Sequence, residues 1–127
     1  MADAIKDAEG RLKQCRTILS LLVGRLQKVE SSEDDAYTDF LEFRRKLKQA
    51  LEKLGEILFA LEGNDVNTAV AVLGQFNAQL RVLTNQSSSI VFLGADAKRV
   101  SDDLAVAGDL ASQATKLFMA KSGRKAA

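Results

Sequence analysis

Proline, tryptophan and histidine are all absent from this chain of 127 residues. Because a proline inside a helix costs about 3 kcal/mol, its absence favours long, uninterrupted helices. The lack of histidine removes the usual general base and the commonest metal ligand, including the Glu-x-x-His pairs of di-iron bundles. We therefore expect no catalytic residues, no metal site and no cofactor, and we expect that the protein is not an enzyme.

Cysteine and long apolar runs are also scarce. Cys15 is the single cysteine, so an internal disulfide is impossible and a reducing compartment is the simpler interpretation. No run approaches the roughly 18 apolar residues that a membrane-spanning helix needs. The N-terminal MADAIKDAEG lacks the basic, apolar and small-residue order of a signal peptide. The sequence thus predicts a soluble, cytoplasmic protein with no membrane span.

Neither sign of charge dominates, because 18 basic and 17 acidic residues give a net charge of +1. Strong non-specific binding to nucleic acids usually needs a clear basic excess. The balance therefore argues against that function, although a local basic patch remains compatible with it.

What the chain does have is apolar residues at alternating steps of three and four, the heptad pattern of packed helices. Such stripes run from Ile5 to Val29, from Val66 to Leu83 and from Ile90 to Phe118. A further helix is expected from about Asp34 to Glu62, with Phe43, Ile57 and Phe59 widening its apolar face. Its stripe is expected to comprise Phe40, Arg44, Leu47, Leu51, Leu54, Leu58 and Leu61.

Short polar turns separate these segments. In LEGNDV, Gly63 is expected to end one helix in the left-handed conformation, and Asn64 or Asp65 to cap the next. Connections this short force neighbouring helices to run antiparallel. The sequence therefore predicts an all-α fold, an antiparallel up-and-down helical bundle of four long helices, or of five if the last is broken near Ser101. Residues 1–121 would form one domain and 122–127 a flexible tail, and the same stripes are also compatible with a homo-oligomer.

Other groups that could carry chemistry have simpler structural interpretations. Cys15 lies on an apolar stripe, which predicts a buried thiol rather than a nucleophile. Asp102 and Asp103 are adjacent, so on a helix they point about 100° apart and do not converge as an acid and a base.

A basic run supplies one candidate site. Arg44, Arg45, Lys48 and Lys53 form a candidate face for a protein partner or for RNA, although no aromatic stacking platform accompanies them. Arg44 falls on the expected apolar stripe, so it either extends out of the core or marks an opening where a partner docks.

Apolar residues beside the last stripe supply a second candidate site. Val91, Phe92, Leu110 and Leu117 form a candidate apolar partner face, since an excess of such residues leaves a groove that can accept a partner helix. The preferred function is therefore a non-enzymatic protein–protein interaction module, an adaptor or scaffold whose partner is another protein. The alternatives are an RNA-associated module and a bundle that binds a small ligand in space left by the small residues Ala97, Ala107, Ala111 and Ala114.

Residues 47–99 also resemble a known family. The stretches LEKLGEILFALEGNDVNTAVAVLGQF and VFLGADAKRV show a leucine-rich helix, a polar turn, an alanine-bearing helix, and an aromatic residue followed by glycine and a Lys-Arg pair. This order resembles the helical domain of the steroid receptor RNA activator protein, also found at the carboxy-terminal end of the large outer-coat subunit of COPII vesicles. The resemblance implies a five-helix adaptor domain of vesicle-coat or coregulator type, without catalysis. The matching positions would be Ala69, Phe92, Gly94 and Lys98–Arg99.

Overall fold

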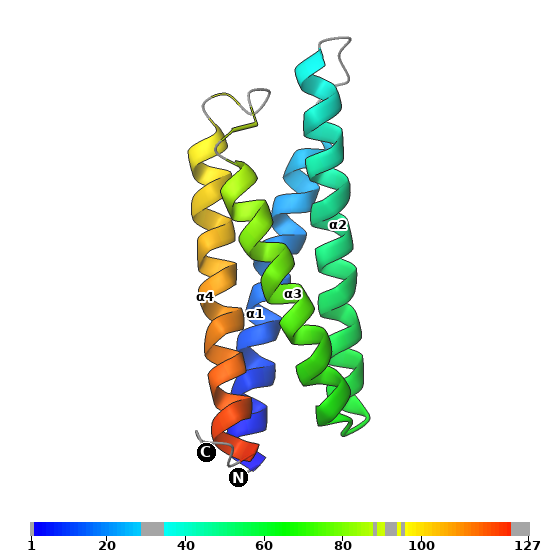
Figure 1. The fold of residues 1–127 in the computed structure, drawn as a ribbon, viewed down its shortest axis with the longest axis vertical. Coiled ribbons are helices and arrows are strands. Elements are labelled where there is room, and N and C mark those ends of the chain that lie inside the picture. Colours follow the sequence, from blue (N-terminus) through cyan, green and yellow to red (C-terminus); the bar gives the residue numbers. More distant parts are fainter. Residues whose placement is uncertain (1, 29–34, 88, 91–93, 95, 123–127) are drawn as a thin grey trace.

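The computed structural model describes residues 2–28, 35–87, 89–90, 94 and 96–122. These residues form four α-helices and no strand, which confirms the predicted all-α fold (Figure 1). The helices are α1 (Ala2–Gln27), α2 (Asp35–Glu62), α3 (Val66–Ser87) and α4 (Ala97–Ser122).

Consecutive helices run in opposite directions, so α1 begins and α4 ends at the same end of the bundle (Figure 1). Each helix packs against two others: α1 and α3 both contact α2 and α4. This arrangement is the predicted up-and-down bundle. No helix in the described part of the chain is both long and apolar enough to cross a bilayer.

The core is built from one apolar stripe on each helix, and the stripes of α1, α3 and α4 are those predicted. Full burial of one leucine or phenylalanine stabilises the fold by about 1.5–3 kcal/mol, so these stripes hold the bundle together. Their buried apolar residues are Ala8, Leu12, Cys15, Leu19, Leu22 and Leu26 on α1, Ala69, Leu73, Phe76, Leu80 and Leu83 on α3, and Val100, Leu104, Ala107, Ala111, Ala114 and Phe118 on α4.

The stripe of α2 differs from the predicted one. Phe43 and Ala50 are buried, whereas Arg44 and Leu51, which were expected on the stripe, are only half-buried at its side. Phe59, which was expected to widen the apolar face, is 77% exposed. The prediction was wrong for Arg44, Leu51 and Phe59, because both sets of positions fit alternating steps of three and four and neighbouring positions differ by only about 100° around the helix. It is confirmed for the other members of the stripe and for Phe43 and Ile57, which are buried.

α4 begins later than predicted and is continuous. It starts at Ala97 rather than near Ile90, and Gly94, three residues before it, has a φ of +54°. Ser101 lies inside the helix, so the break that would have given a fifth helix does not occur there. Residues 123–127, most of the predicted tail, are outside the described residues.

The turn between α2 and α3 also ends its helix differently from the prediction. Asn64, not Gly63, takes the left-handed conformation, with a φ of 61°. The Asn64 amide donates to the Leu61 carbonyl at 3.0 Å and the Asp65 amide to the Ala60 carbonyl at 2.8 Å, the two hydrogen bonds of a Schellman motif. The turn is a structural connection that reverses the chain in three residues, 63–65, so that α3 runs back along α2.

Candidate functional site

The four predicted cations do not form one face in the structure. Arg44 and Lys53 are nine residues apart, which places them about 180° apart around α2. Arg44 reaches α1, and Lys53 donates through Nζ to Gln75 Oε1 on α3 at 3.0 Å. Arg45 and Lys48 are exposed on the outside of the helix between these two directions. The structure thus brings together only two of the four residues.

Arg44 has a structural partner. Its Nη1 donates to the Leu26 carbonyl at 3.3 Å, in the last turn of α1, and its guanidinium lies 5.6 Å from the centre of the Phe40 ring. The last carbonyls of a helix have no partner within it and carry partial negative charge, so a cation there is stabilising. Arg44 therefore caps the C-terminal end of α1 and does not mark an opening for a partner.

The predicted apolar partner face is only partly described. Leu110 and Leu117 are half-buried and pack against the core, while Val91 and Phe92 lie outside the described residues. The described part of this candidate site is therefore largely used in packing the bundle.

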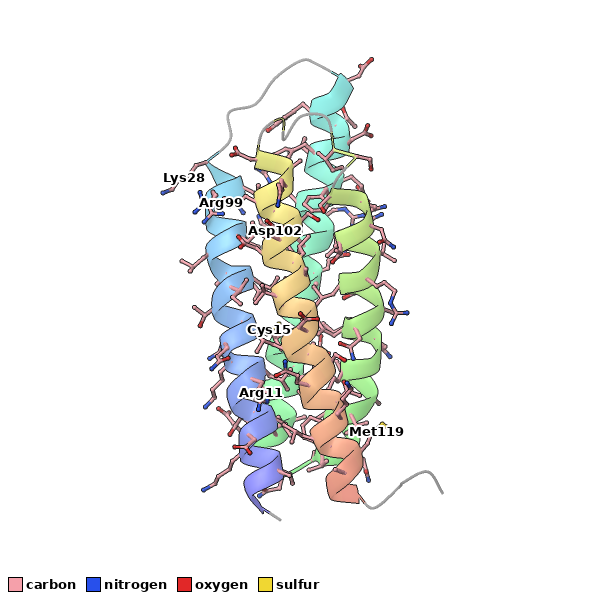
Figure 2. All side chains as sticks on the ribbon, turned by 90° about the vertical axis from the view of Figure 1, so that its left-hand side faces the viewer. Arg11, Cys15, Lys28, Arg99, Asp102 and Met119 are labelled. Atoms are coloured by element: carbon pink, nitrogen blue, oxygen red, sulfur yellow. The ribbon has the colours of Figure 1, made fainter. Side chains whose placement is uncertain are left out.

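Cys15 is fully buried between α1 and α4, as predicted (Figure 2). Its thiol donates to the Ala107 carbonyl, with Sγ and O 3.5 Å apart. Burial raises the pKa of Cys15 to about 12, because the thiolate would lose its hydration. A thiol in this environment stays protonated at neutral pH and does not act as a nucleophile.

The two adjacent aspartates diverge, as the helix geometry predicted. Asp102 pairs with Lys98 on its own helix at 3.1 Å, and Asp103 pairs with Arg25 of α1 at 3.4 Å. Both pairs are solvent-exposed and contribute little stability. In the part of the chain that the structure describes, no group of three metal-ligating side chains lies together.

The outside of α2 carries a stripe that the sequence analysis missed. We call it the outer α2 face. It has apolar side chains at its two ends, since Phe59 is 77% and Leu41 36% exposed, and charged side chains between them. Arg45 is salt-bridged to Glu42 and holds the pKa of that carboxyl below its usual value. The outer α2 face consists of Leu41, Arg45, Lys48, Glu52, Gly55 and Phe59.

A hollow of about 680 Å³ lies beside Phe59, where α2 turns into α3. Gly55 contributes bare backbone to it, and the α2–α3 turn forms its other side. The turn is fixed by Asp65, whose Oδ1 accepts a hydrogen bond from the Thr68 amide at 3.2 Å. Hydrogen bonds from Thr68 lower the pKa of Asp65. The hollow is lined by Gly55, Glu56, Phe59, Ala60, Gly63, Asp65 and Thr68.

The alanines predicted to leave space for a small ligand are packed instead. Ala107, Ala111 and Ala114 are fully buried, and Ala107 contacts Cys15 of α1. A surface groove of about 480 Å³ does lie between α3 and α4, where Asn77 donates to Thr115 Oγ1 at 2.9 Å. This groove is open and most of its lining residues are polar, unlike the enclosed, mostly apolar cavities that hold small ligands.

Comparison with known proteins identifies no relative of this chain. No protein-family model matches it, and no curated protein and no solved structure gives a significant match. The resemblance to the steroid receptor RNA activator and COPII domain family therefore remains a prediction from the quoted residues.

Proposed function

We propose that this chain is a protein–protein interaction module that binds its partner on the outer α2 face. The observation that carries the proposal is the exposure of Phe59, the most exposed large apolar side chain among the described residues. Aromatic anchors of this kind contribute much of the binding energy at protein interfaces. Covering the exposed three-quarters of its surface would remove about 150 Å² from water, worth about 4 kcal/mol before the costs of association.

The surroundings of Phe59 support the same function. The hollow beside it offers a place for a side chain of the partner, and Leu41 supplies a second apolar contact at the other end of the face. Charged residues between them would fix the register of binding. Without histidine and with its thiol buried and protonated, the chain has few groups suited to catalysis, so we propose a non-enzymatic adaptor or scaffold.

RNA binding is the weaker alternative, because the cations that suggested it point to different sides of α2 and Arg44 is held by α1. If the family resemblance holds, the module would serve in a vesicle coat or with a transcriptional coregulator. We also propose that it acts in the cytoplasm, which its free cysteine supports.

The test is recovery of tagged protein from its native lysate, with F59S and L21S as matched variants. Leu21 is 65% exposed on α1, so L21S removes a comparable apolar side chain from another helix. We expect the wild-type chain and L21S to recover the same stoichiometric protein, and F59S to lose it, with and without RNase. Equal recovery by F59S would contradict the proposed surface, and loss on RNase treatment would favour the RNA alternative.

A further inference from the structure

The outer α2 face is complementary to itself when a second copy is laid antiparallel against it. Its six residues follow one another at steps of four and three, the spacing of positions that face a partner helix in a coiled coil. Antiparallel pairing about a midpoint at residue 50 then sets each position opposite another member of the same face. The pairs are Leu41 with Phe59, Arg45 with Gly55 and Lys48 with Glu52, and each pair occurs twice.

The apolar ends of the face match under this pairing. Leu41 and Phe59 are separated by eighteen residues, about 27 Å along α2. Antiparallel pairing places each exposed Phe59 against the exposed Leu41 of the second copy. Both apolar ends are then covered at once. Parallel copies in register would also cover them, by pairing Leu41 with Leu41 and Phe59 with Phe59, so the apolar ends fit both directions.

The charges at the centre of the face select the antiparallel direction. Lys48 and Glu52 are both exposed, and within the described residues neither takes part in an ion pair. Antiparallel copies would set Lys48 opposite Glu52 twice. Parallel copies in register would set Lys48 against Lys48 and Glu52 against Glu52, which is repulsive.

Gly55 is compatible with close approach at this face. A Cβ atom placed on it would meet nothing within 4 Å, as is also true of Gly10, Gly24, Gly74 and Gly108, so the glycine does not by itself select this face. Its bare backbone leaves room for the long side chain of Arg45 from the second copy, and the exposed carboxylate of Glu56 lies next to it to accept the guanidinium.

From these features we propose that the partner of the outer α2 face is a second copy of this chain, bound antiparallel in a two-fold symmetric dimer. The same patch serves both subunits, as an isologous interface requires. This inference rests on the proposed function and names its partner. α2 is free to meet a second molecule because its outer side lies at the edge of the bundle (Figure 1).

The test is sedimentation equilibrium of the purified full chain over a range of concentrations, with charge-swapped variants. K48E sets two carboxylates against each other in each half of the interface, and E52K sets two ammonium groups against each other. We expect each single variant to dimerise about tenfold or more weakly than wild type. The double variant K48E/E52K restores the opposite charges and is expected to dimerise within about twofold of wild type.

Mixing the two single variants gives the sharpest readout. Across a K48E–E52K pair every central contact joins opposite charges, so the mixture is expected to form a heterodimer about tenfold or more tightly than either variant forms a homodimer. K13E, which makes the same charge change on the exposed side of α1, is the control and should dimerise like wild type. Circular dichroism of each variant checks that the bundle is intact.

Three results would overturn the proposed dimer: a wild-type chain that is monomeric at every concentration, single variants that dimerise like wild type, or a double variant that stays as weak as the singles. A monomeric chain whose recovery of another protein still depends on Phe59 would overturn the self-association alone and leave the proposed function standing. A monomeric chain that also recovers no partner through Phe59 would overturn both the proposed dimer and the proposed function.

Discussion

Replacing Phe43 and Phe59 separately by alanine tests which side of α2 faces the core. The two residues are sixteen positions apart, about 160° around the helix. Phe43 is 1% exposed and Phe59 is 77% exposed. The same chemical change should therefore destabilise the fold strongly at Phe43 and very little at Phe59.

The magnitudes follow from the buried areas. Phe43 removes about 200 Å² of apolar surface from water, worth about 5 kcal/mol at most, and phenylalanine-to-alanine changes in cores typically cost about 3–5 kcal/mol. Less than a quarter of the surface of Phe59 is covered. That covered part is worth about 1 kcal/mol, and the better helix propensity of alanine offsets about half of it. We expect F43A to lower the free energy of unfolding by about 3–5 kcal/mol, and F59A to change it by less than about 0.5 kcal/mol.

The assay is urea unfolding followed by circular dichroism, at a protein concentration low enough that association does not add to stability. The slope of the transition should be the same for both variants, because the surface exposed on unfolding hardly changes. A large loss of stability in F59A, or a loss below about 1 kcal/mol in F43A, would show that the register of α2 is wrong. The outer α2 face would then not exist as described.

Three further predictions concern single side chains. R44A should lower the free energy of unfolding by about 1–2 kcal/mol, because it leaves the Leu26 carbonyl without its donor and removes the contact with the Phe40 ring, whereas R45A should leave thermal stability nearly unchanged. Cys15 should react with Ellman's reagent only after unfolding. Because its pKa is raised to about 12, the contribution of Cys15 to stability should be constant below about pH 9 and fall as the pH rises beyond it. The lowered pKa of Asp65 gives the reverse dependence. The contribution of Asp65 to stability is fully present above the pKa of this carboxyl in the unfolded chain and is lost as the pH falls through its pKa in the folded protein. D65N keeps an amide oxygen as the helix cap but cannot titrate, so it should reduce the loss of stability at acid pH in a pH–stability curve.

The helices and most of the core could be predicted from the sequence because apolar spacing reports directly on helix packing. On α1, α3 and α4 only one stripe satisfies the pattern, and it is the buried one. On α2 two adjacent stripes satisfy it. Phe43 and Arg44 both precede Leu47 by three or four residues, so periodicity alone could not choose between them, although the charge of Arg44 favoured Phe43.

The candidate site was harder to predict, because it depends on that choice. Once Phe43 and Ala50 face the core, the residues spaced by four and three positions from Leu41 to Phe59 must lie on the outer side of α2. The signal in the sequence was limited to the two apolar residues at the ends of this series, Leu41 and Phe59, because the positions between them are charged or glycine. The basic run predicts one face because its members are close in sequence, but the helix distributes them around its axis.

The measurement that tests the central claim most directly is photo-crosslinking from the outer α2 face. Benzoylphenylalanine would replace Phe59 in one protein and Leu21 in another, because both side chains are exposed but on different helices. On illumination in native lysate, position 59 should give one discrete protein adduct, at the mass of two chains if the partner is a second copy, and position 21 should give none. No adduct from position 59, or the same adducts from both positions, would contradict the claim that this face is where the protein binds its partner.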